Sequence, residues 1–236
     1  MERTAQAVYA HVQRAREMGI ERIYAFGTSA VRDAANRDFL LNRVRALCHL
    51  ELEVMSGEQE AMLAYAGAAP QGRAGVIDIG GGSTELLCGS EGKVLRSGSA
   101  QLGAVRLLHR LGSDRDALVE AALEMLSDTV RAVQGEPVER WIGVGGTITS
   151  LAAMDLELEP YSSEAIELHP IFRGAARAWL ARLCQMSVEQ RYALPGLQKR
   201  RADIIASGGA VLGAFFQAFP EVDRVLASEH DNLEGF

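Results

Sequence analysis

Cysteine is scarce in this sequence of 236 residues, and its three copies, Cys48, Cys88 and Cys184, lie far apart. An odd number of cysteines without a Cys-x-x-Cys pair indicates neither a disulfide framework nor a zinc knuckle. A chain without disulfides is typical of a reducing compartment. We therefore expect a cytoplasmic protein.

Positive charge and long apolar segments are also scarce. The 24 Lys and Arg residues are outnumbered by 31 Asp and Glu residues, which gives a net charge of −7. Surfaces that bind nucleic acid or membranes are usually basic, so we expect neither as a partner. Residues 1–20 lack the apolar core of a signal peptide, and the most apolar tract, residues 204–219, is too short and too interrupted by glycine to span a bilayer.

Short apolar strands alternate with amphipathic helices along the chain, which predicts the α/β class. Proline suits the first turn of a helix, so Pro170 is expected to begin one. The expected strands are residues 23–26, 52–55, 76–79, 85–88, 94–97, 141–144 and 222–227, and the expected helices include residues 4–18, 103–111, 148–154 and 202–219.

A glycine-rich turn follows one of these strands in the segment Val-Ile-Asp-Ile-Gly-Gly-Gly-Ser-Thr-Glu, residues 76–85. Glycine has no Cβ, so Gly80, Gly81 and Gly82 allow the backbone to approach a ligand closely. Ser83 and Thr84 add hydroxyl donors. Backbone N–H groups and hydroxyls suit phosphate oxygens. The alternative is a tight hairpin that only joins two strands.

Three carboxylates lie near this turn or near another strand end. Asp78 and Glu85 frame the turn, and carboxylates beside a phosphate suit Mg²⁺ or orient a water molecule. Glu60 follows Ser-Gly-Glu-Gln, which fits a capping box, so it falls in the first turn of a helix. It is either a general base toward a water that attacks phosphorus or a residue that stabilises the helix dipole.

Two further segments could bind phosphate. Arg32 lies in a loop of small residues after a strand, where it could clamp a phosphate or form a surface pair with Asp33. Gly145, Gly146 and Thr147 follow a predicted strand directly and open a helix, which is a typical anion cradle.

A basic run in this acidic chain comes from Lys199, Arg200 and Arg201. It is either a solvated helix start or a docking site for a polyanionic tail.

Taken in order, these motifs resemble those of the exopolyphosphatase/guanosine pentaphosphate phosphohydrolase (Ppx/GppA) family, a branch of the actin-like superfamily. The resemblance covers essentially the whole chain. Its motifs are residues 28–34 (Thr-Ser-Ala-Val-Arg-Asp-Ala), 56–61 (Ser-Gly-Glu-Gln-Glu-Ala), 77–85 (Ile-Asp-Ile-Gly-Gly-Gly-Ser-Thr-Glu), 102–107 (Leu-Gly-Ala-Val-Arg-Leu), 143–147 (Gly-Val-Gly-Gly-Thr) and 201–205 (Arg-Ala-Asp-Ile-Ile).

The resemblance implies an α/β, actin-like fold with two ribonuclease-H-like lobes. Residues 1–72 would form a first lobe and residues 73–236 the second. The family's N-terminal strands and first phosphate loop do not precede Met1, so we expect an incomplete first lobe of the short family type. Its strands would keep exposed edges, which makes a homodimer plausible.

The resemblance also implies Mg²⁺-dependent hydrolysis of the terminal phosphate of inorganic polyphosphate, or of the 5′-phosphate of guanosine pentaphosphate (pppGpp). By position, Glu60 matches the water-activating carboxylate, and Asp78 and Glu85 match the acids near metal and phosphate. Residues 80–84 match a phosphate loop, and Arg32 matches a phosphate-contacting arginine. The alternatives are a non-catalytic fragment that binds phosphate, nucleotide or a partner, and a kinase or ATPase of the same superfamily.

Overall fold

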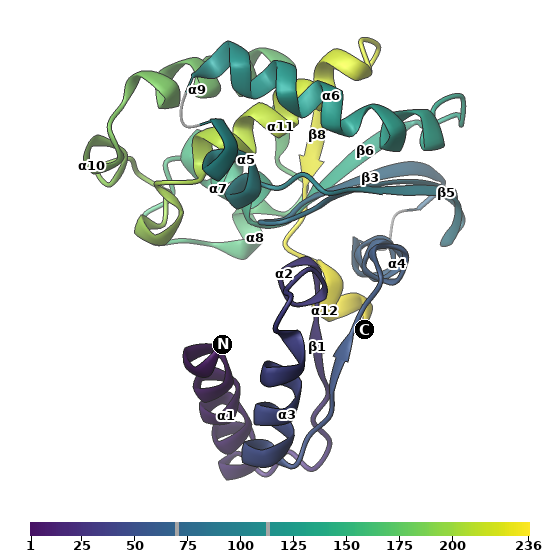
Figure 1. The fold of residues 1–236 in the computed structure, drawn as a ribbon. Helices are drawn as coiled ribbons and strands as arrows, with labels where there is room; N and C mark the ends of the chain where they lie inside the picture. The colour runs from purple at the N-terminus through teal and green to yellow at the C-terminus, as the bar shows by residue number, and fades with distance from the viewer. Residues whose placement is uncertain (69–70, 112–113) are drawn as a thin grey trace. The chain divides into compact units, whose positions relative to one another are not determined.

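The computed structural model describes residues 1–68, 71–111 and 114–236 and divides into two compact units, Met1–Gly57 and Glu58–Phe236 (Figure 1). The division falls after Gly57, the first residue of helix α4 (Gly57–Ala68), whereas we expected it after residue 72. The reason is packing, because α4 buries Ala64 and Tyr65 in one apolar cluster with the sheet of the second unit.

The first unit packs two helices beside a parallel pair of short strands. Its apolar core comes from Ala5 and Val12 on α1 and from Leu40, Val44 and Cys48 on α3. The elements are α1 (Glu2–Glu17), β1 (Ala25–Gly27), α2 (Ser29–Arg32), α3 (Arg37–Cys48) and β2 (Leu52–Val54).

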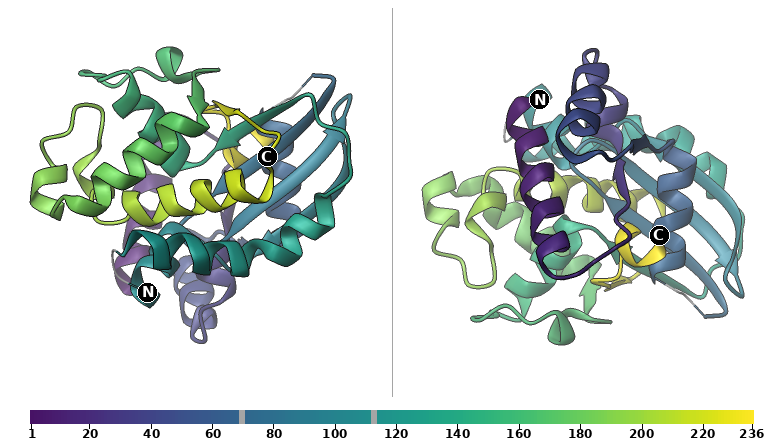
Figure 2. Two further views of the ribbon diagram at one scale, coloured as in Figure 1. Left: turned by 90° about the horizontal axis from the view of Figure 1, so that it is seen from above. Right: turned by 90° about the horizontal axis from the view of Figure 1, so that it is seen from below.

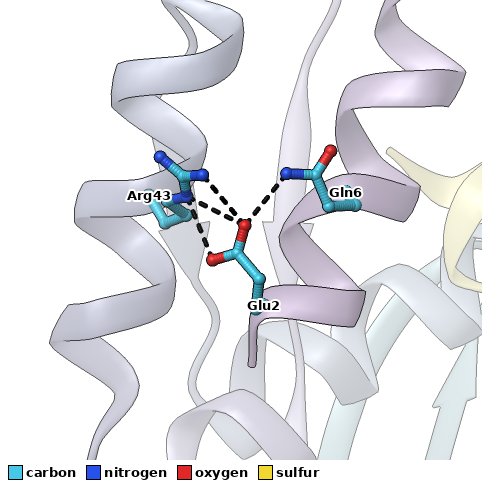
Figure 3. A network of polar contacts seen from close by, with 3 residues as sticks. All are labelled: Glu2, Gln6 and Arg43. Carbon is cyan, nitrogen blue, oxygen red and sulfur yellow. Dashed lines mark hydrogen bonds and ion pairs between the residues drawn. The ribbon is translucent and has the colours of Figure 1, made fainter.

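A polar network on the surface joins α1 to α3 (Figure 3). The carboxylate of Glu2 accepts hydrogen bonds of 2.9–3.1 Å from the guanidinium of Arg43 and one of 2.9 Å from the amide of Gln6. The hydrogen bond from Arg43 lowers the pKa of Glu2. The first turn of α1 is thereby tied to α3.

The second unit contains a six-stranded mixed sheet in the order β5-β4-β3-β6-β8-β7. Strands β3, β6 and β8 are parallel to one another, and β4, β5 and β7 run antiparallel to their neighbours. The strands are β3 (Arg73–Ile79), β4 (Thr84–Ser90), β5 (Lys93–Ala100), β6 (Arg140–Val144), β7 (Pro170–Phe172) and β8 (Arg224–Ala227).

Helices cover both faces of this sheet (Figures 1 and 2). One face carries Ile77, Ile79 and Leu86 and packs against α5, α6, α7, α9 and α11, while the other carries Val76 and Leu87 and packs against α4. The helices are α5 (Ala104–Leu111), α6 (Arg115–Val133), α7 (Gly146–Asp155), α8 (Ser163–Ile166), α9 (Arg173–Gln185), α10 (Val188–Arg191), α11 (Ile205–Ala218) and α12 (Asn232–Gly235), with a 3₁₀ turn at Lys199–Arg201.

The expectation for Pro170 was wrong. Pro170 begins β7, and the helix that follows starts at Arg173. Proline is tolerated there because β7 is the last strand of the sheet, where a missing N–H breaks no inner ladder.

None of the helices in the described parts of the chain combines the length and apolarity needed to cross a bilayer.

Candidate active site

Three predicted carboxylates converge on the α4 face of the second sheet. Asp78 on β3 and Glu85 on β4 are direct partners in the antiparallel register, so their side chains share one face. They alternate along their strands with residues of the opposite face and line up with Val76 and Leu87, which contact α4. Glu60 lies in the first turn of α4 and adds its charge to both other acids.

All three carboxylates are withdrawn from solvent, with exposed fractions of 6 % for Glu60, 6 % for Asp78 and 0 % for Glu85. Burial raises the pKa of Asp78 to about 7, and the charges of Glu60 and Asp231 add to this rise. Burial raises the pKa of Glu85 to about 8, with further contributions from Asp78 and Glu60. A cluster of this kind favours a proton or a cation among its oxygens.

Hydroxyl groups hold Glu85 in place but leave one of its oxygens unsatisfied. Ser99 donates a hydrogen bond of 2.8 Å to Glu85 Oε1, and the Ser99 and Ser83 side chains oppose the rise of the Glu85 pKa. Glu85 Oε2 is buried and has no hydrogen-bond partner. A buried acceptor without a donor is costly, so this oxygen is suited to a ligand.

The predicted phosphate turn connects β3 to β4 and is fastened through its carbonyl groups. Gly80 O accepts from the N–H of Ala104, and Gly81 O accepts from that of Val105, both at the start of α5. Within the described residues, the N–H groups of Gly81 and Gly82 donate to no backbone carbonyl. These two donors are thus suited to an anion.

Thr84 has a different role from the one we expected. Its side chain is fully buried, and its hydroxyl donates a hydrogen bond of 2.6 Å to Leu102 O. Since Thr84 is paired with Ile79 in the register, it points to the face opposite the carboxylates. The structure therefore uses this hydroxyl to fix the loop before α5.

The second glycine turn lies beside the first, because β6 is the parallel neighbour of β3 and pairs Val144 with Asp78. Gly145 has φ +86°, a conformation that favours glycine. A Cβ on Gly145 would lie 2.7 Å from Asp78 Oδ1, so this turn reaches the acidic cluster directly. Thr147 is buried against Gly208 of α11, where it helps to anchor the start of α7.

Both turns lie at the carboxyl ends of adjacent parallel strands. The chain continues from β3 to β4 on one side of the sheet and returns in β6 on the other. In open α/β sheets, ligands bind at such a reversal of strand order. The N-terminus of α7 adds the positive end of a helix dipole at this place.

Arg201 joins this site; the sequence placed it in a basic run and at the start of the motif of residues 201–205, without a role at this turn. A Cβ on Gly146 would overlap the guanidinium of Arg201, with 1.7 Å to Nη1. Burial lowers the pKa of Arg201, whereas its neighbours Lys199 and Arg200 are exposed. The cation next to the second glycine turn is therefore Arg201, the first residue of the Arg-Ala-Asp-Ile-Ile motif.

Arg32 belongs to the first unit. Its Nη1 donates a hydrogen bond of 2.8 Å to Met55 O, just after β2. This contact links the carboxyl ends of β1 and β2, since Met55 N also donates to Gly27 O.

Across residues 1–68, 71–111 and 114–236, no group of three or more His, Cys, Asp and Glu side chains is arranged to hold a metal ion. Asp78 and Glu85 offer two carboxylates, the number that Mg²⁺ commonly takes from a protein when a phosphate completes its coordination.

Comparison with known proteins points to a single family. The family model described as "Ppx/GppA phosphatase family" matches residues 1–233. Exopolyphosphatase 2 of Mycobacterium tuberculosis is 36 % identical over 235 residues, an alignment that covers 91 % of this chain and 73 % of that protein.

Solved structures agree in fold. The Ppx/GppA family member of Aquifex aeolicus is 30 % identical with a TM-score of 0.82, covering 99 % of this chain and 78 % of that one. An exopolyphosphatase from Cytophaga hutchinsonii is 22 % identical with a TM-score of 0.89, covering 100 % of this chain and 80 % of that one, and shows the shared fold. The expected α/β, actin-like two-lobe class is confirmed.

Proposed function

Because this chain belongs to the Ppx/GppA phosphatase family, we propose that it is an exopolyphosphatase, which hydrolyses the terminal phosphoanhydride bond of inorganic polyphosphate. The observation that carries the proposal is the buried acidic cluster of Glu60, Asp78 and Glu85 beside two glycine turns. The name of the relative from Mycobacterium tuberculosis favours polyphosphate over other phosphoanhydrides.

Glu60 is the proposed general base. It lies in the first turn of α4, buried among other carboxylates, where a water molecule could be oriented toward phosphorus.

The terminal phosphate would be held by backbone donors and one cation. The N–H groups of Gly81 and Gly82 and the start of α7 at Gly146 supply donors, and Arg201 supplies positive charge. Phosphoryl transfer depends mostly on positioning and charge neutralisation, so these groups match its requirements. We propose that Arg32 is also a phosphate-contacting residue.

Asp78 and Glu85 would hold Mg²⁺ if the enzyme requires it. Their fit is supported by the unsatisfied Oε2 of Glu85, and by the burial and neighbouring negative charges that raise the pKa values of both residues. A bound Mg²⁺ supplies positive charge that neutralises phosphate oxygens.

Orthophosphate release from long-chain polyphosphate in the presence of Mg²⁺ tests the proposal. We expect orthophosphate to be released without any acceptor molecule that becomes phosphorylated. This result distinguishes a hydrolase, which uses water as the acceptor, from a kinase. The same assay with pppGpp measures the second candidate substrate, whose terminal bond has the same chemistry. If polyphosphate binds but no phosphate is released from either substrate, the chain is a non-catalytic binder and the proposal is wrong.

A further inference from the structure

The segment after β8, residues 228–231, is anchored by one carboxylate, and we call this segment the strap. Ser228 Oγ donates hydrogen bonds of 3.0 and 3.1 Å to the two oxygens of Glu167, and Glu229 N donates one of 3.0 Å to Glu167 Oε2. Ser228 N also donates to Gly143 O of β6 at 2.9 Å. Glu167 lies between α8 and β7, so it fixes the course of the strap from outside the glycine turns.

The strap leads directly into α12, which lies against α4 (Figure 2, right). A Cβ on Gly67 of α4 would be 1.9 Å from Asp231 O, and a Cβ on Gly235 of α12 would be 2.0 Å from Leu63 O. Because glycine has no Cβ, the two helices approach each other backbone to backbone. Leu63 and Gly67 follow Glu60 by about one and two helical turns. The strap and α12 thus reach the helix that carries Glu60.

The sheet holds α4 mostly through small side chains. Its buried residues in the cluster with the strands are Ala61, Ala64 and Tyr65, and two of these three are alanine. Alanine projects little into a neighbouring surface, so it resists sliding of a helix less than a larger side chain does. Leu63 and Gly67 are four residues apart and lie on another side of α4. Contact with α12 on that side therefore helps to fix where α4 and its first turn lie.

We propose that Glu167 is a positioning residue of the active site. By anchoring the strap, its carboxylate holds α12 against α4, and α12 in turn keeps Glu60 in place relative to the carboxylates of the sheet. The inference rests on the proposed function, in which Glu60 is the general base. A base must be held in a productive geometry, because a misplacement of about 1 Å can lower the rate by about a hundredfold.

Glu167→Ala removes the anchor of the strap. We expect kcat for phosphate release to fall by about tenfold or more, because Glu60 loses its fixed position. KM for polyphosphate should stay unchanged, since the groups proposed to bind phosphate lie on other elements. Glu164→Ala is the matched control with unchanged kcat, because Glu164 is an exposed glutamate of the neighbouring helix α8. A wild-type kcat in Glu167→Ala, or an equal fall in Glu164→Ala, overturns the inference.

Gly235→Ala tests the far end of the same connection, because its Cβ would overlap Leu63 O and push α12 away from α4. We expect a fall in kcat like that of Glu167→Ala. If both substitutions release the same element, the double variant loses no more activity than the more affected single variant. Independent effects would instead multiply. A double variant whose loss is the product of the two single losses therefore overturns the inference.

Amide hydrogen exchange provides a second readout that requires no activity. We expect residues 57–68 of α4 to exchange about tenfold faster in Glu167→Ala, because the hydrogen bonds that keep α12 in place are lost. Exchange in α6, which packs on the opposite face of the sheet, should stay at the wild-type rate. Unchanged exchange in α4 overturns the inference. Faster exchange in both helices also overturns it, because it indicates a general loss of stability.

The two readouts also separate this inference from the proposed function. If the wild-type chain releases no phosphate, the proposed function fails, and hydrogen exchange of α4 still decides whether Glu167 holds this helix in place. If Glu167→Ala does not fold, Ser228→Ala replaces it in both assays, because it removes the hydroxyl that donates to Glu167. A lower kcat with faster exchange of α4 in that variant supports the inference, and wild-type values refute it.

Discussion

Asp78 and Glu85 are buried on the sheet face that also carries the apolar residues Val76 and Leu87, and Glu60 is buried in the first turn of α4. Carboxylates are seldom fully buried unless they are paired, because desolvation opposes their charge. Such an arrangement lowers stability, and clusters of perturbed acids of this kind are typical of active sites.

Glu60→Gln should keep polyphosphate binding and lower kcat by a factor on the order of 10² to 10⁴, because the amide cannot accept the proton of the attacking water. Phosphate release and equilibrium binding of polyphosphate would be measured on the same preparation. Glu58→Gln is the matched control, since Glu58 lies in the same turn of α4 but is exposed. Equal kcat values for Glu60→Gln and the wild type would remove Glu60 from the mechanism.

The raised pKa values of Asp78 and Glu85 predict the dependence of stability on pH in the absence of Mg²⁺. An unfolded Glu has a pKa of about 4.3, so between about pH 4.3 and about 8 the folded state binds more protons than the unfolded state. The free energy of unfolding must then fall as the pH rises through this window. Because glutamine does not titrate, the free energy of unfolding of the Glu85→Gln variant should fall less over the same pH window.

Thermal unfolding between pH 5 and pH 8 would measure this difference, which we expect to be on the order of a few °C in Tm. Glu58→Gln should retain the wild-type slope, because Glu58 is exposed. A Glu85→Gln protein whose Tm falls with pH as steeply as the wild type's would contradict the prediction.

At the scale of elements, two glycine turns and one helix N-terminus determine what the sheet can bind. The turn at Gly80 keeps its shape because the start of α5 occupies its carbonyl groups. The turn at Gly145 lies against Asp78, and Gly146 lies against Arg201. A larger residue at Gly145 would displace the Asp78 carboxylate, and one at Gly146 would displace the Arg201 guanidinium.

Gly146→Ala should leave the fold intact, because the overlapping group is the flexible end of Arg201, which can move. Displacing that guanidinium removes a charge-assisted contact of about 1.5–3 kcal/mol, so we expect KM for polyphosphate to rise by about tenfold or more. Gly174→Ala, also in the first turn of a helix, meets nothing within 4 Å and should leave KM unchanged. Steady-state kinetics on both variants decide between these outcomes, and an unchanged KM in Gly146→Ala would argue against Arg201 as a phosphate contact.

At the scale of the whole molecule, the first unit has a sheet of two three-residue strands. Within the described residues, no third strand pairs with β1 or β2. Pairs of this kind are rarely stable alone, and their free edges can pair with another chain.

We therefore predict self-association into a homodimer. Light scattering coupled to size-exclusion chromatography should give twice the chain mass of 25.5 kDa at micromolar concentrations and a lower mass on dilution. A single species of 25.5 kDa at every concentration would refute the prediction.

Several features of this protein depend only on neighbouring residues and could be predicted from the chain. The glycine turns at Gly80 and Gly145, the start of α4 near Glu60 and the Asp78–Glu85 hairpin all follow from short segments with strong conformational preferences. Most of the expected strands were also correct, because buried strands carry clear apolar runs. Family membership followed from the order of these same motifs.

Tertiary packing sets which distant residue completes the site. Arg201 reaches it from a segment more than fifty residues beyond the second glycine turn, through packing on Gly146. Packing also directs the Thr84 hydroxyl to Leu102 O and places Pro170 at the start of the edge strand β7. Local preferences cannot specify such contacts. The contacts depend on the register of the sheet and on which helix faces each residue after the core has formed.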